Sequence, residues 1–220
     1  MVSVGHHLLM APDSTTQALV SSGVVAVLRA PTADGFAAVA DVLVNAGITA
    51  IEVTLTSRGA VDAIAGLRRQ LPAHAVVGAG TVLTADQAKA SVDAGAAFLV
   101  SPVLDAELIA VDHGVPFYAG GLTPSEIHAA HRAGSPLVKL FPAAAVGPRY
   151  VKDLHGPLPD VRIMPTGGID IGDVAAWLGA GATAVGLGGP LIGDAASGGS
   201  MAALAARARH AVSAVAFARS

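Results

Sequence analysis

Short apolar runs alternate with longer, helix-like segments along most of the chain. The runs begin at Val24, Ile48, Ala75, Ala96, Val115, Leu137, Val161 and Ala182. They are continuously apolar, which is typical of parallel strands buried on both faces. The segments between them, such as 33–47 and 123–134, repeat apolar residues at the spacing of an amphipathic helix. The pattern therefore predicts eight strand–helix units in succession.

Helix boundary signals agree with this division. Residues suited to an N-cap stand at Thr84, Thr123 and Asp170. Glycines that suit the position just after a helix stand at Gly47, Gly95, Gly134 and Gly181. We also expect a helix over 14–22, before the first strand, and a last helix over 201–218.

Eight such units in roughly 200 residues predict an α/β fold, a single (β/α)8 TIM barrel with an extra N-terminal helix. The competing architecture is a doubly wound open sheet, which rarely needs eight such regular units. We expect residues 1–13 to be a mobile N-terminal tail and residues 14–220 to form one catalytic barrel domain.

Composition narrows the class of protein. Of the 220 residues, 53% are hydrophobic and 13% charged, and the net charge is -3, so a large core is expected and a nucleic-acid surface is not. The chain has no cysteine, which excludes disulfides and thiolate metal sites. Neither a signal peptide nor an apolar run of ~18 residues is recognisable. We therefore expect a cytoplasmic enzyme without membrane or nucleic-acid partners.

Three charged residues stand in or at the end of predicted strands. Lys139 is one of three lysines and lies within the apolar sequence LVKLFP. Glu52, one of three glutamates, lies within AIEVTL, and Arg29 ends the first strand. Catalytic residues of this fold come from the carboxyl ends of different strands. The three residues are therefore candidates for one site.

Lys139 and Glu52 admit two interpretations. They can form a structural ion pair, or they can perform chemistry. Because a buried pair stabilises less than apolar packing, we favour the second. Burial disfavours a charged amine, and an uncharged Lys139 is a nucleophile toward a carbonyl. Glu52 then serves as the general acid and base.

Glycine pairs follow the seventh and eighth predicted strands, at Gly167-Gly168 and Gly188-Gly189. In this fold, the loops after those strands commonly bind phosphate through backbone N–H groups, although ordinary turns would also use glycine. The segment 78–81, GAGT, offers a cradle suited to a small carboxylate. The histidines show no metal-ligand spacing, and no GxGxxG follows the first strand, so we expect neither a metal nor a dinucleotide cofactor.

The sequence resembles the 2-keto-3-deoxy-6-phosphogluconate aldolase family, which includes 4-hydroxy-2-oxoglutarate and phosphogalactonate aldolases. The matching segments are VAVLRA, IEVTLTS, GAGTVLT, VSPVLD, VKLFPA, VGPRYVKDLHGPLP and MPTGGI. The resemblance runs from about Val24 to the last helix. It implies a class I aldolase that cleaves 2-keto-3-deoxy-6-phosphogluconate to pyruvate and glyceraldehyde 3-phosphate, and a homotrimer.

The resemblance also implies roles for individual residues. Lys139 would form the Schiff base, and Glu52 would move protons through water. Arg29 and Thr81 would bind the carboxylate end of the keto acid, and Pro102 would shape the pocket for the pyruvate methyl group. The distal hydroxyls and the phosphate would be held by Thr166, Gly167, Gly168, Gly188 and Gly189.

Three departures from the family pattern bear on the substrate. Thr56 stands where some members carry an arginine. The contact with the substrate's anionic group then falls to Arg29 or, as a substitute, to Arg58. Ala119-Gly120 stands where many members have Pro-Gly, and Pro190 where some have a phosphate-binding serine.

Several alternatives follow. One alternative substrate is a related 2-keto-3-deoxy or 4-hydroxy-2-keto acid, such as the phosphogalactonate epimer or 4-hydroxy-2-oxoglutarate. In rivals of other classes, Glu52 abstracts a proton in an isomerase or epimerase, or the barrel binds a sugar phosphate without catalysis.

Overall fold

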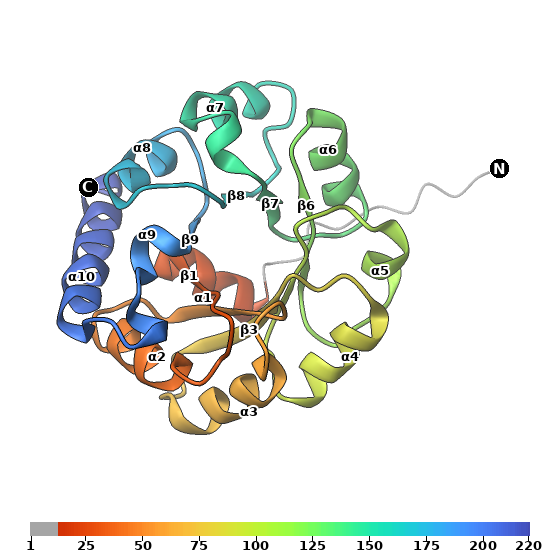
Figure 1. Cartoon of the computed structure of the whole chain (residues 1–220). Coiled ribbons are helices and arrows are strands. Elements are labelled where there is room, and N and C mark those ends of the chain that lie inside the picture. Colours follow the sequence, from red (N-terminus) through yellow and green to blue (C-terminus); the bar gives the residue numbers. More distant parts are fainter. Residues whose placement is uncertain (1–12) are drawn as a thin grey trace.

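The computed structural model describes residues 13–220. Apart from Asp13, the N-terminal tail expected over 1–13 lies outside the described residues. The fold is α/β: parallel strands curl around a shared interior, and helices cover their outer side (Figure 1). Around the outside, α2 to α8 and α10 follow one another in chain order.

The strands lie inside the apolar runs that the sequence pattern singles out. In chain order they are β1 (Val24–Leu28), β2 (Ala50–Thr54), β3 (Val76–Gly80), β4 (Leu99–Val100), β5 (Phe117–Tyr118), β6 (Gly120–Gly121), β7 (Val138–Leu140), β8 (Ile163–Pro165) and β9 (Val185–Leu187).

The helices are α1 (Ser14–Ser22), α2 (Phe36–Asn45), α3 (Ala60–Gln70), α4 (Ala85–Asp93), α5 (Ala106–Ala110), α6 (Pro124–Arg132), α7 (Pro148–His155), α8 (Val174–Gly179), α9 (Gly189–Ile192) and α10 (Met201–Ala218). Short 3₁₀ turns are η1 (Ala143–Ala145), η2 (Ile171–Asp173) and η3 (Ala195–Ser197).

All strand pairs are parallel. One sheet has the order β5-β4-β3-β2-β1-β9, and a second has the order β6-β7-β8. The two sheets meet at two places: Ala119 alone separates β5 from β6, and a parallel bridge joins Thr166 to Gly186, next to β8 and within β9. Because every strand runs the same way, their carboxyl ends share one edge, where the candidate residues Arg29 and Thr81 follow β1 and β3. Glu52 and Lys139 lie within β2 and β7.

Two apolar clusters form the core. The larger one packs the outer helices against the strands and includes Phe36, Ile64 and Leu187. The smaller one lies inside the curl of the strands and consists of Leu19, Val25, Ala50, Phe98, Val100, Tyr118, Leu137, Met164 and Ala184. Alternate residues of each strand point to opposite faces, so a curled sheet buries both.

Helix α1 contributes to the interior cluster from the amino-terminal side. Its Leu19 is fully buried there. Its Thr16 hydroxyl donates to the Asp13 carboxylate at 2.8 Å and lies 2.8 Å from the Tyr118 hydroxyl. The Thr16 hydroxyl has one proton and donates it to Asp13, so the Tyr118 hydroxyl is the donor in its hydrogen bond with Thr16. Burial raises the pKa of Tyr118, which keeps this hydroxyl protonated.

Most of the predicted capping residues stand at helix boundaries. Thr84 and Thr123 accept from backbone N–H groups at the starts of α4 and α6, as expected. The four glycines predicted to follow helices all have left-handed φ angles, between 92° and 104°. The expectation for Asp170 is wrong in detail. It precedes the 3₁₀ turn η2 and makes no capping bond through its side chain, and α8 begins only at Val174.

No helix within residues 13–220 combines the length and apolarity needed to cross a membrane.

Candidate active site

Lys139 and Glu52 meet inside the curl of the strands. Lys139 lies on β7 and Glu52 on β2, and Nζ donates to Oε1 at 3.4 Å. Lys139 is 3% exposed and Glu52 fully buried. The Nζ atom also lies 5.6 Å from the centre of the Phe141 ring. A buried amine, a carboxyl group and an aromatic wall therefore share one site.

Glycines on neighbouring strands permit close packing around the site, one against the Glu52 side chain and one against the backbone of Pro102. A Cβ atom on Gly80 of β3 would overlap the Glu52 carboxylate. Gly120 of β6 is paired with Lys139, and a Cβ atom there would collide with the backbone of Pro102. Sequence reasoning read the first glycine only as part of a carboxylate cradle. Its spacing role depends on contacts across strands that no local pattern reveals.

One oxygen of Glu52 has no protein partner. Oε2 is buried and makes no hydrogen bond with any described residue. An unpaired buried oxygen of a carboxylate is costly, so such an atom in a native protein calls for a partner. A water molecule or a substrate group at Oε2 would provide it. This free acceptor beside an amine is what proton transfer to and from a Lys139 adduct requires.

Arg29 and Thr81 lie together at the same edge of the strands. Arg29 follows β1, is exposed, and donates to the Thr81 hydroxyl at 3.3 Å. Thr81 follows β3 and has a φ angle of 61°, which is uncommon for a residue with a β-branched side chain. Such backbone outliers cluster at binding sites, because the surrounding structure has to hold them in place.

The remaining predicted residues follow β4, β8 and β9. Pro102 follows β4 and is half-buried. Thr166 is 5% exposed and bridges to Gly186, on which a Cβ atom would overlap the threonine hydroxyl.

The predicted glycine pairs follow the same two strands, β8 and β9. Gly167 and Gly168 have positive φ angles of 96° and 70°, and Gly188 leads into α9, which begins at Gly189.

The three positions that depart from the family pattern all lie among the described residues. Thr56 is exposed and donates to the Thr54 hydroxyl at 3.2 Å. Ala119 and Gly120 are buried at the join between β5 and β6. Pro190 lies in the first turn of α9.

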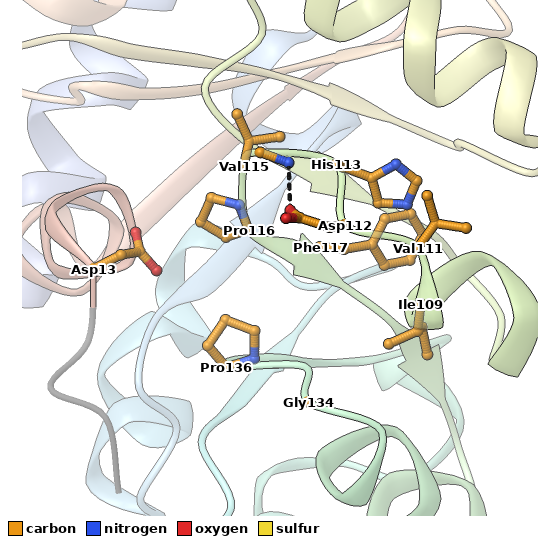
Figure 2. Close-up of a pocket in the computed structure, with 11 residues that line it drawn as sticks. Asp13, Ile109, Val111, Asp112, His113, Val115, Pro116, Phe117, Gly134 and Pro136 are labelled. Carbon is orange, nitrogen blue, oxygen red and sulfur yellow. Dashed lines mark hydrogen bonds between the residues drawn. The ribbon is translucent and has the colours of Figure 1, made fainter. Parts of the chain in front are cut away.

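A separate cavity of about 410 Å³ has none of these residues in its lining (Figure 2). It is lined by Asp13 and by segments that precede β5 and β7, and so belongs to the amino-terminal ends of the strands. Its polar groups already have partners: Asp112 accepts from the Gly114 N–H at 2.9 Å, and His113 bonds the Leu108 carbonyl at 2.8 Å. This cavity offers no converging free groups for chemistry.

The sequence profile described as "Aldolase: KDPG and KHG aldolase" matches residues 16–204. The chain belongs to this family. The match covers every residue of the candidate site, from Arg29 to Gly189.

Individual relatives agree with this assignment. The chain is 42% identical over 142 residues to the 2-dehydro-3-deoxy-phosphogluconate aldolase of Pseudomonas aeruginosa, which is 63% of this chain and 64% of that enzyme. It is 34% identical over 170 residues to the 2-dehydro-3-deoxy-6-phosphogalactonate aldolase of Escherichia coli K12, which is 76% of this chain and 83% of that enzyme.

Solved structures share the fold closely. A structure described as "Native KDPGal structure" superposes with a TM-score of 0.83 at 32% identity, over 89% of this chain and 95% of that one. The KDPG aldolase of Legionella pneumophila, with pyruvate captured as a covalent carbinolamine intermediate, superposes with a TM-score of 0.81 at 29% identity, over 89% and 96%.

Proposed function

We propose that this protein is a class I aldolase that cleaves 2-keto-3-deoxy-6-phosphogluconate to pyruvate and glyceraldehyde 3-phosphate. The observation that carries the proposal is the buried Lys139–Glu52 pair with its unpartnered carboxylate oxygen. The family membership and the aldolase names of the relatives support it. So does the carbinolamine of pyruvate in the Legionella enzyme.

In this mechanism, the uncharged amine of Lys139 attacks the C2 ketone of the keto acid and forms a carbinolamine. Loss of water gives a protonated iminium, with Glu52 moving the protons through water at its free Oε2 atom. A base removes the C4 hydroxyl proton, a carbonyl forms at C4, and the electrons of the C3–C4 bond flow into the iminium. Glyceraldehyde 3-phosphate leaves, C3 of the enamine is protonated, and water hydrolyses the iminium to pyruvate.

Substrate binding is divided between the two ends of the molecule cleaved. Arg29 and Thr81 bind the carboxylate, and Pro102 bounds the methyl pocket. Thr166 with Gly167 and Gly168, and Gly188 with Gly189, hold the distal hydroxyls and the phosphate. Binding energy from this remote end positions the bond that breaks.

We also propose that the strands close into a complete (β/α)8 barrel, with β5 and β6 acting as one strand. The bridge between Thr166 and Gly186 and the hydrogen bond from the Thr183 N–H to the Ile163 carbonyl support closure between β8 and β9. In this arrangement α1 closes the amino-terminal end of a single domain. A homotrimer in the cytoplasm, working without a metal or other cofactor, remains a prediction.

A second substrate is favoured by one observation. Pro190 provides neither an N–H group nor a hydroxyl at the start of α9, which weakens the expected phosphate site. Unphosphorylated 4-hydroxy-2-oxoglutarate is therefore a candidate for the same chemistry. The phosphogalactonate epimer carries the phosphate and remains an alternative on the family resemblance alone.

Pyruvate release from a panel of 2-keto-3-deoxy acids and 4-hydroxy-2-oxoglutarate tests the proposal. We expect fastest turnover with 2-keto-3-deoxy-6-phosphogluconate, loss of all turnover in Lys139→Ala, and normal turnover in Lys152→Ala, which alters an exposed lysine on α7. Turnover that survives Lys139→Ala would contradict the proposal. Proton exchange into a sugar phosphate without pyruvate release would favour an isomerase, and ligand binding without any turnover would favour a non-catalytic barrel.

A further inference from the structure

Two buried hydroxyl groups link the backbone on both sides of Arg29. The Ala30 N–H donates to Ser57 Oγ at 3.2 Å, Ser57 Oγ lies 3.4 Å from Thr54 Oγ1, and Thr54 Oγ1 donates to the Leu28 carbonyl at 3.0 Å. Ser57 is 2% exposed and Thr54 fully buried. The path starts one residue after Arg29 and ends one residue before it.

The direction of the bonds follows from the number of protons available. Each hydroxyl carries one proton and accepts through two lone pairs. Thr54 donates its one hydroxyl proton to the Leu28 carbonyl. Thr54 Oγ1 can therefore only accept, and it does so from the hydroxyl groups of Ser57 and of Thr56, the latter at 3.2 Å. Ser57 accepts from Ala30 and donates to Thr54. Every group on this path is satisfied in a single arrangement, which we call the hydroxyl staple.

The loop that carries Arg29 is joined to the same segment further along. Thr32 and Arg58 form a parallel bridge, and the Ala33 N–H donates to the Arg58 carbonyl at 2.9 Å. The Arg58 N–H donates to the Pro31 carbonyl at 3.2 Å. The residues after β1 are thus fixed to the residues after β2 at both ends. The hydroxyl staple is the side-chain link between the two peptide groups that flank Arg29.

We propose that Ser57 and Thr54 are positioning residues for recognition of the keto acid's carboxylate. They fix the backbone of Arg29, so that its guanidinium lies against Thr81 before the substrate arrives. The exposed side chain of Arg29 has no other hydrogen-bond partner among the described residues. A long side chain held only by one 3.3 Å contact at its tip needs a fixed base to remain aligned. This inference rests on the proposed function, in which Arg29 binds the carboxylate.

Trapping of the pyruvate adduct with borohydride gives a direct test. The half-saturating pyruvate concentration is measured for wild type, Ser57→Ala, Arg29→Met and the double variant. We expect Ser57→Ala to raise it about 3- to 10-fold with little change in the limiting labelling rate, because one hydrogen bond is lost. In the Arg29→Met variant, adding Ser57→Ala should not raise the half-saturating pyruvate concentration any further.

Two controls separate positioning from stability. Ser91→Ala removes another buried hydroxyl, which donates to the Gln87 carbonyl at 2.8 Å on the outer helix α4, and should leave the half-saturating concentration unchanged. Hydroxyacetone, an uncharged ketone, should label wild type and Ser57→Ala with the same concentration dependence. Thr54→Val cuts the staple at its other link and replaces Ser57→Ala if that variant does not fold.

The outcomes are distinct. The positioning role would be overturned if Ser57→Ala raised the half-saturating pyruvate concentration equally in wild type and in the Arg29→Met variant. It would also be overturned if Ser57→Ala left that concentration unchanged in wild type. Failure of wild type to label with pyruvate would instead overturn the proposed function.

Discussion

Glu52 owes its position to a side chain that is missing from the neighbouring strand. Gly80 on β3 lies where any Cβ atom would overlap the Glu52 carboxylate. The buried acid therefore fits only because the adjacent residue has no side chain. This close packing also limits how Glu52 can rotate, and it leaves Oε2 free while Oε1 stays near Lys139.

We predict that Gly80→Ala lowers kcat by about 10²-fold, because it displaces a catalytic group by a distance on the order of 1 Å. Overpacking should also cost about 1–3 kcal/mol of unfolding free energy. Pyruvate release and urea unfolding measure the two effects. Gly66→Ala on α3 is the matched control: a Cβ atom there meets nothing within 4 Å, so kcat should be unchanged. A Gly80→Ala enzyme with normal kcat would refute this account of Glu52.

At the scale of single residues, the sequence reveals charged side chains within apolar runs. It does not reveal the contacts that a residue makes with another strand. Lys139 and Glu52 stand out because a charge inside an apolar run demands a reason. Ser57 has no such signal, because a serine after a strand is ordinary turn chemistry. Its importance appears only when the segments after β1 and β2 are placed side by side.

Helix α1 makes one fully buried side-chain hydrogen bond to strand β5, among apolar contacts. The Tyr118 hydroxyl on β5 donates to Thr16, and both residues are fully buried. Neither group can exchange its partner for water without opening the amino-terminal end. Because this contact lies opposite the candidate active site, it should affect stability without affecting chemistry.

We predict that Thr16→Val lowers the free energy of unfolding by about 1–3 kcal/mol, because the Tyr118 hydroxyl is left buried without an acceptor. Adding Tyr118→Phe should recover part of that loss, since both polar groups are then removed. Urea unfolding of the two single variants and the double variant measures the coupling. Strictly additive losses, or a lower kcat in Thr16→Val, would contradict this view of α1.

The elements themselves were largely predictable, and the exceptions have local causes. Strands and major helices follow from apolar runs and capping residues. The division of one expected strand into β5 and β6 does not, because the Ala119 N–H donates to the buried Ser135 hydroxyl at 2.9 Å. Helix α9 was not expected either, since four residues are too few to show a helical period.

Across the whole molecule, the two ends of the parallel strands have different tasks. At the amino-terminal end, Leu19 of α1 is buried in the interior apolar cluster. Toward the carboxyl end, Lys139 contacts Glu52 and Arg29 contacts Thr81, and each pair joins strands that are apart in the sequence. Their assembly could be anticipated because parallel strands share an edge, but the distances between side chains depend on packing that only the folded chain defines.

Mass spectrometry after borohydride reduction in the presence of pyruvate tests the central claim most directly. We predict one added pyruvate-derived group, located on the peptide that contains Lys139, and no such product in Lys139→Ala. Labelling of Lys89 or Lys152 instead, or an unmodified chain, would contradict the assignment of Lys139 as the Schiff-base residue.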